Sequence, residues 1–169
     1  MFLNNKINAV SFGEVLFDVF GNEKKIGGAP LNLALRIASF GFPVSMISAV
    51  GNDEDGRVIC DFVAQHHLDT RGIICTSEYD TGVVQVTLND RGSATYEIKY
   101  PAAWDFIEAN ENTRNIVKNA NVFFYGSLAC RNEVSQQTLF SLLNANPEMF
   151  KVFDVNLRKP FYNIELLKN

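Results

Sequence analysis

The chain has 169 residues, 47% of them hydrophobic and 20% charged, a balance typical of a folded protein rather than a disordered one. Its net charge is −4, and no run of Lys or Arg forms the basic stripe that binds nucleic acid. No segment reaches the roughly 20 apolar residues that span a bilayer, and residues 1–10 lack a signal-peptide core. The cysteines, Cys60, Cys75 and Cys130, lack metal-ligand spacing and are interpreted as reduced thiols. We therefore expect a cytoplasmic protein that binds neither nucleic acid nor membranes.

Strand and helix patterns alternate in the first part of the chain. The predicted elements, in order, are a buried strand at 7–12, an extended segment at 15–20, a helix at 30–40, an apolar strand at 44–50, a helix at 52–67 and a short strand at 72–75. The first helix begins at Pro30 and ends at Gly41. Its polar residues Asn32, Arg36 and Ser39 share one narrow face, so the other faces are expected to be packed.

The pattern then changes to a period of two. Apolar residues alternate over 81–88, a turn is predicted at 89–92, and alternation resumes over 94–100. This pattern predicts an antiparallel hairpin with one apolar face. We expect a small β lid that projects from the main sheet and is formed by segments 14–26 and 81–101.

Alternating helices and strands return after Trp104. The predicted elements are a helix at 110–119, a strand at 122–125, a helix at 134–143, a strand at 150–154 and the start of a helix at 163–168. The alternation predicts an α/β fold with a mainly parallel sheet flanked by helices on both faces.

Two polar features stand at the ends of predicted elements. Gly27 and Gly28 allow a close backbone approach, Pro30 presets a helical turn, and Asn32 offers donors and an acceptor to hydroxyl groups. The pattern predicts either a site for a small polar molecule or a tight turn before a core helix. Asp18, which follows the first predicted strand, either clamps neighbouring hydroxyls or serves as a cap or solvated loop residue.

The spacing of these residues resembles the first signature of the PfkB, or ribokinase-like, carbohydrate kinases. The matching positions are Gly27, Gly28, Pro30, Asn32, Ala34, Gly41 and Gly51. Gly13-Glu14 with Asp18 and the segment 50–56 resemble further family motifs, and segments 125–129 and 153–158 are similar to fructokinase-type members. The resemblance covers nearly the whole chain but only the N-terminal portion of a family member. It implies a ribokinase-like fold whose C-terminal part is absent.

The resemblance implies that the chain supplies the sugar-binding half of an enzyme that phosphorylates a sugar hydroxyl, with ATP and Mg²⁺ as cofactors. By position, Asp18, Gly28, Ala29 and Asn32 would hold the sugar. The lid of such enzymes often pairs between subunits, which implies a homodimer. The apolar row Ala94, Tyr96 and Ile98 would face the sugar or a partner lid, or pack on the body. Trp104 is expected to reach the pocket.

Asn156 and Arg158 follow the last predicted strand, at the sheet edge where α/β proteins bind ligands. Arg158 would neutralise charge on the transferred phosphoryl group, or form a surface ion pair, and the same alternatives apply to Arg131. The second family signature, Asp-Thr-x-Gly-Ala-Gly-Asp, does not occur in this sequence. Its Asp base is expected beyond Asn169, no metal ligand is predicted, and the chain alone is expected to be inactive. A non-catalytic sugar-binding module and a nucleoside kinase of the same family remain alternatives.

Overall fold

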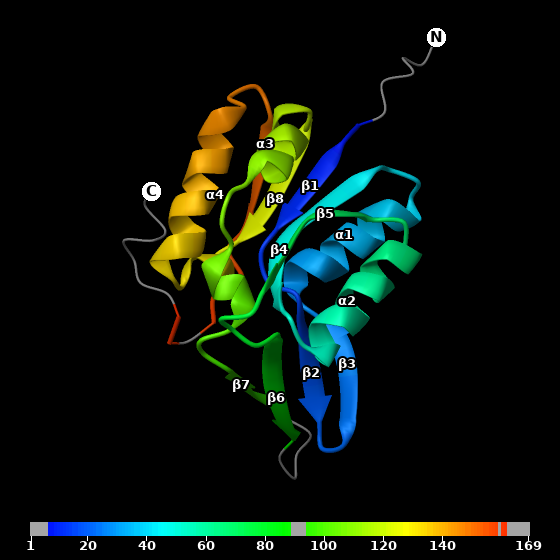
Figure 1. Ribbon diagram of the computed structural model, residues 1–169, viewed down its shortest axis with the longest axis vertical. Helices are drawn as coiled ribbons and strands as arrows, with labels where there is room; N and C mark the ends of the chain where they lie inside the picture. The colour runs from blue at the N-terminus through cyan, green and yellow to red at the C-terminus, as the bar shows by residue number, and fades with distance from the viewer. Residues whose placement is uncertain (1–6, 89–93, 159, 162–169) are drawn as a thin grey trace.

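The computed structural model describes residues 7–88, 94–158 and 160–161. Five parallel strands form the main sheet, in the order β5-β4-β1-β8-β9 (Figure 1). Their bounds are β1 (Ala9–Phe12), β4 (Val44–Gly51), β5 (Asp69–Thr76), β8 (Val122–Gly126) and β9 (Phe150–Asp154). The apolar runs of the sequence become these strands because a parallel sheet is covered on both faces.

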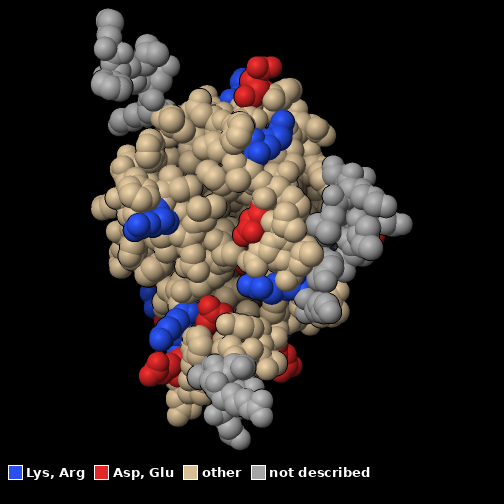
Figure 2. All heavy atoms as spheres, turned by 180° about the vertical axis from the view of Figure 1, so that it is seen from behind, with Lys and Arg blue, Asp and Glu red and all other residues tan. Residues whose placement is uncertain are grey.

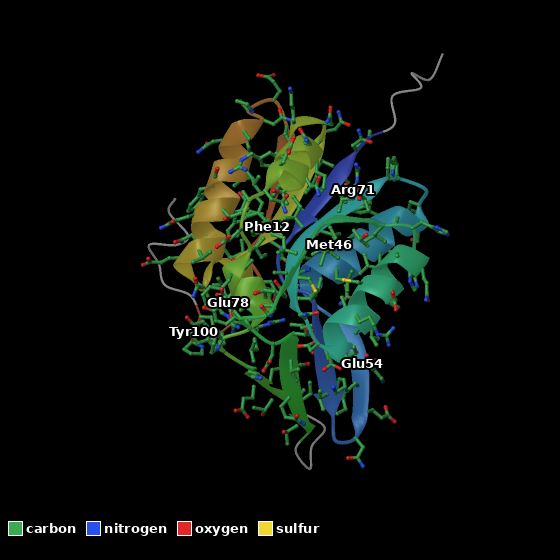
Figure 3. The ribbon with its side chains drawn as sticks, in the orientation of Figure 1. Phe12, Met46, Glu54, Arg71, Glu78 and Tyr100 are labelled. Carbon is green, nitrogen blue, oxygen red and sulfur yellow. The ribbon has the colours of Figure 1, made fainter. Side chains whose placement is uncertain are left out.

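Helices cover the two faces of this sheet. On one face α1 (Ala29–Ser39) and α2 (Glu54–Gln65) pack over a core that includes Met46. On the other, α3 (Glu111–Lys118), α4 (Glu133–Ala145) and the short helix η1 (Ala103–Phe106) pack over a core that includes Phe12. Figure 3 shows Phe12 on the side of α4 and Met46 on the side of α1. This arrangement is the predicted α/β architecture.

The predicted elements differ from the structure mainly at their ends. The strand predicted at 72–75 extends over 69–76, where it pairs with β4. Two short helices, η1 and η2 (Leu128–Cys130), were not predicted because a single turn leaves no periodic pattern. The predicted turn at 89–92 and helix at 163–168 lie outside the described residues.

A second, small sheet has the strand order β3-β2-β6-β7. Its strands are β2 (Leu16–Phe20), β3 (Glu23–Gly27), β6 (Gly82–Leu88) and β7 (Ala94–Ile98). β2 and β3 form one antiparallel hairpin, β6 and β7 form another, and β2 pairs in parallel with β6. The expected hairpin is therefore present, within a sheet of mixed direction that extends from one end of the molecule (Figure 1).

The side chain of Asp53 joins α2 to the small sheet. One carboxylate oxygen accepts from Gly56 N–H at 2.7 Å and so caps α2, and the other accepts from Thr81 N–H at 2.8 Å, immediately before β6. The Thr81 hydroxyl also donates to Asp53, at 2.7 Å. Burial raises the pKa of Asp53, but the hydrogen bonds from Thr81 and Gly56 outweigh burial and hold the pKa below its ordinary value.

The surface carries charges of both signs. Figure 2, which shows the face opposite to that of Figure 1, has acidic and basic side chains interspersed, with several of each near the small sheet at the lower end. None of the helices in the described part of the chain is long and apolar enough to cross a bilayer.

Candidate functional site

A cavity of about 210 Å³ lies where the start of α1, the small sheet and the carboxyl ends of β8 and β9 meet. Its lining residues are Glu14, Leu16, Asp18, Gly28, Ala29, Asn32, Val84, Tyr96, Ile98, Leu128, Asn156 and Arg158. The carboxyl edge of a parallel sheet is the usual place for ligands in such folds, because loops from several strands converge there. The predicted site residues other than Trp104 are thus brought together in one cavity.

Gly28 lines the cavity at the start of α1, and Gly27 precedes it in the chain. Gly28 has a φ of 111°, and a Cβ atom at this position would collide with the carbonyl oxygen of Glu14. A Cβ atom on Gly27 would collide with the carboxylate of Asp18. The backbone clash excludes a larger residue at Gly28, whereas a larger residue at Gly27 would displace the Asp18 carboxylate, which lies directly against the backbone that precedes the helix.

The small sheet supplies the opposite, largely apolar wall. Its register places Asp18, Val84 and Ile98 in one row across β2, β6 and β7, and Tyr96 lies in the next row, opposite Val86. Residues in register on neighbouring strands point to the same face, which explains why these side chains share the cavity. Burial raises the pKa of Asp18 above its ordinary value. The wall therefore combines one carboxyl group with an apolar surface.

Asn156 and Arg158 follow β9 and give this edge of the cavity two polar side chains. The turn is ordered by Asp154, whose side chain accepts from Asn156 N–H at 3.1 Å. The Ser127 hydroxyl, after β8, donates to the carbonyl oxygen of Val155 at 3.3 Å. Amide and guanidinium groups in this position are suited to anionic oxygens.

Glu14 is a lining residue to which the sequence assigned no ligand role. The side chain is 4% exposed, and its Oε1 accepts from Ala29 N–H, the first residue of α1, at 3.2 Å. Its Oε2 is buried and has no hydrogen-bond partner among the described residues. Burial raises the pKa of Glu14 to about 7, against smaller opposing effects of the backbone hydrogen bonds. An acidic residue directly after a buried strand was the available signal, because that position places it at the carboxyl edge.

Trp104 corrects a prediction, because it does not line the cavity. Its side chain is fully buried in the core beside α3 and α4, and a Cβ atom on Gly82 would meet its indole nitrogen. The guanidinium carbon of Arg131 lies 3.9 Å from the centre of its ring. Arg131 itself forms a buried ion pair with Asp105, rather than the surface pair or phosphate contact considered from the sequence.

Within the described ranges, no group of three or more His, Cys, Asp or Glu side chains could hold a metal ion. The polar side chains that line the cavity carry one amide and one guanidinium beside the β9 turn, two carboxyl groups and an amide beside α1 and β2, and the hydroxyl of Tyr96 on β7.

Comparison with known sequences gives related proteins whose names describe them as sugar kinases or fructokinases. A family model described as pfkB family carbohydrate kinase matches residues 3–168. An uncharacterized sugar kinase of Pyrococcus horikoshii, PH1459, is 30% identical over 160 residues, which is 88% of this chain and 51% of that protein. Fructokinase-1 of Zea mays is 31% identical over 133 residues, which is 71% of this chain and 41% of that protein. The chain spans about half the length of the curated relatives it matches.

Comparison with solved structures gives the same group of proteins. The crystal structure of PH1459 matches with a TM-score of 0.84 at 29% identity, over 95% of this chain and 58% of that chain. A structure of PH1459 in complex with ATP matches with a TM-score of 0.83 at 28% identity, over 96% of this chain and 58% of that chain. Fructokinase from Xylella fastidiosa has a TM-score of 0.81 at 23% identity, over 95% and 54% of the two chains, and shows the fold alone.

These matches confirm the predicted ribokinase-like α/β fold. The family model extends over nearly the entire sequence and includes both segments that form the cavity wall, the glycine pair with α1 and the small sheet. The chain therefore belongs to the pfkB family of carbohydrate kinases.

Proposed function

We propose that this chain provides the sugar-binding half of a fructokinase-like enzyme that transfers a phosphoryl group from ATP to a sugar hydroxyl. The observation that carries the proposal is that Asp18 of β2 and Gly28 and Asn32 at the start of α1 line one cavity at the carboxyl edge of the sheet. Two polar side chains of complementary hydrogen-bonding type in a small, partly apolar cavity suit a molecule with several hydroxyl groups.

In this proposal polar and apolar side chains contact different parts of the sugar. The Asp18 carboxylate accepts hydrogen bonds from two neighbouring hydroxyls, and the Asn32 amide both donates and accepts. Val84, Tyr96 and Ile98 pack against the carbon skeleton and exclude water. In this proposal segments 14–26 and 81–101 form a lid over the sugar, and two such lids pair in a homodimer.

The phosphate side lies at the turn after β9. Arg158 and Asn156 are the groups that would contact phosphate oxygens, and Arg158 would offset their negative charge. Bound ATP would supply the phosphoryl group, and PH1459, a relative, has been solved with ATP. Within the described residues, no group of three or more His, Cys, Asp or Glu side chains could hold Mg²⁺. Without an Asp-Thr-x-Gly-Ala-Gly-Asp segment, the 169-residue chain by itself is expected not to phosphorylate sugars.

Calorimetric titration of the chain with D-fructose and with D-ribose tests the sugar site. We expect binding of one of them, and a loss of about 10- to 100-fold in affinity for Asp18→Asn, because hydrogen bonds to a charged group contribute about 1.5–3 kcal/mol. Asp61→Asn, on the exposed side of α2, is the matched control and should bind as the parent does. Equal affinity of the Asp18 variant and the parent would contradict the proposed sugar site. Robust ATP-dependent phosphorylation of a sugar by the 169-residue chain would contradict its expected inactivity.

A further inference from the structure

Glu14 lies on the wall between two cavities. The first is the candidate sugar cavity, and the second, of about 300 Å³, lies between the start of α1 and the ends of β8 and β9. The residues that line both are Glu14, Ala29, Leu128 and Asn156. Glu14 therefore lies next to any ligand that fills either cavity at this wall.

The two oxygens of this carboxyl group differ in their surroundings. Oε1 accepts a hydrogen bond from the first N–H of α1, at 3.2 Å from Ala29 N. Oε2 is buried and has no partner among the described residues. A buried polar atom without a partner costs about 1–3 kcal/mol, so such an atom beside a cavity points to a ligand that supplies the missing hydrogen bond.

We propose that Glu14 is a ligand-binding residue of this site, and that its Oε2 carries a proton and donates a hydrogen bond to an oxygen of the bound sugar. The inference rests on the proposed function, since the ligand is the sugar of that proposal. It adds a neutral donor to the Asp18 and Asn32 side chains of the proposed sugar site, and it makes sugar binding depend on the protonation of Glu14.

The charged groups around Glu14 support a protonated state near neutral pH. Asp154, at the end of β9, disfavours a second negative charge, and burial acts in the same direction. Arg131 favours the charge only weakly, because its guanidinium is held by Asp105. The thiol of Cys130 has a pKa raised to about 11 by burial and by Glu14, so it does not titrate in the same range.

The other charged groups at the cavity are Asp18, whose pKa lies above its ordinary value, and Arg158. The carboxyl group of Glu14 has a pKa of about 7, so it loses its proton as the pH rises from 6 to 8. If the sugar binds only the protonated form, its affinity falls by about tenfold over these two pH units, because one proton is taken up with the ligand.

The experiment is calorimetric titration of the 169-residue chain with D-fructose, and with D-ribose, at pH 6, 7 and 8. We expect the affinity of the parent to fall about tenfold from pH 6 to pH 8. Glu14→Gln keeps an acceptor for Ala29 N–H and a permanent N–H donor in place of the proton. It should bind within about threefold of the parent at pH 6 and with constant affinity to pH 8. Glu14→Leu should bind at least tenfold more weakly at every pH.

Glu148→Gln is the matched control, because Glu148 is exposed in the loop before β9, and it should keep the pH profile of the parent. The inference is overturned if Glu14→Gln shows the same fall in affinity as the parent, and this comparison suffices if Glu14→Leu does not fold. If Asp18→Asn binds weakly while both Glu14 variants bind as the parent does, only this inference fails. If the Glu14 variants behave as expected but Asp18→Asn binds the sugar as the parent does, the proposed role of Asp18 in the sugar site fails. If neither sugar binds the parent, both fail.

Discussion

At the residue scale, the ion pair between Arg131 and Asp105 is the most buried charge pair of the described structure, with 1% and 0% of the two side chains exposed. Arg131 donates to the two carboxylate oxygens at 2.6 and 2.7 Å, and to the carbonyl oxygen of Lys99 at 2.8 Å. Its planar group also covers the ring of Trp104. One guanidinium therefore connects the segment after β8 to the segment that leaves β7.

Removal of one partner leaves the other charge buried without compensation, which costs about 3–5 kcal/mol of unfolding free energy. We expect Asp105→Asn to lose an amount in this range in urea denaturation followed by the fluorescence of Trp104, the single tryptophan of the chain. Asp80→Asn is the control, since the pair between Asp80 and Lys99 is exposed and contributes about 1 kcal/mol or less. Similar losses in the two variants would show that burial does not set the value of the inner pair.

At the element scale, the Asp53 side chain fastens the N-terminus of α2 to the residue before β6. We expect Asp53→Ala to lower the free energy of unfolding at pH 7 by about 0.5–2 kcal/mol, the cost of a lost helix cap. The pKa of Asp53 lies below its ordinary value of 3.8 in the folded state, so this stabilisation is complete above about pH 4 and disappears as the pH falls through the lower, folded value.

Thermal unfolding followed by circular dichroism at pH 7 and pH 3 measures this effect. The difference between the parent and Asp53→Ala should shrink at the lower pH. Asp61→Ala, on the exposed surface of α2, should show a much smaller difference at pH 7. A difference for Asp53→Ala that stayed constant with pH would mean that its carboxylate charge does not contribute.

How well the site could be predicted depends on the range of the interactions that form it. Gly27, Gly28 and Asn32 are close together in the sequence, so their pattern identifies the start of α1 directly. Asp18 is brought beside them because β2 and β3 form a short hairpin. These positions follow from local rules for glycines, helix starts and hairpins.

The positions of Trp104 and Glu14 could not be predicted in this way, because they depend on contacts between segments that are distant in the sequence. Trp104 was expected at the cavity because it follows β7, but the core between η1 and α4 binds its large ring more favourably. Glu14 was visible only as part of a motif, and the sequence does not show that one of its oxygens is used by Ala29 N–H and the other is left without a partner. Such information appears only when the elements are packed together.

At the scale of the whole molecule, the described sheet ends at β9, and apolar side chains near this edge are exposed. Phe150 in β9 is 71% exposed, and the cavity between β9 and α1 is lined by Leu33, Phe124 and Val152. An uncovered strand edge beside apolar residues favours association between chains. The chain on its own is therefore expected to self-associate.

Sedimentation velocity at increasing protein concentration tests this expectation. Phe150→Lys should reduce the associated fraction, because a charged edge residue opposes pairing between strands. Phe42→Lys changes another exposed aromatic residue, between α1 and β4, and should have little effect. A parent chain that remains monomeric at all concentrations would contradict the expectation.

The parallel pairing of β2 with β6 has a consequence for biosynthesis. The hairpin that carries Asp18 leaves the ribosome early, but its partner strand follows only after α1, β4, α2 and β5 have been made. During translation the growing polypeptide thus has the Asp18 carboxyl group of the candidate site long before it has the opposite wall of the cavity, which is complete when Ile98 emerges. Joining the two strands closes a long loop, so this part of the protein gains its shape after the segments between them have become compact.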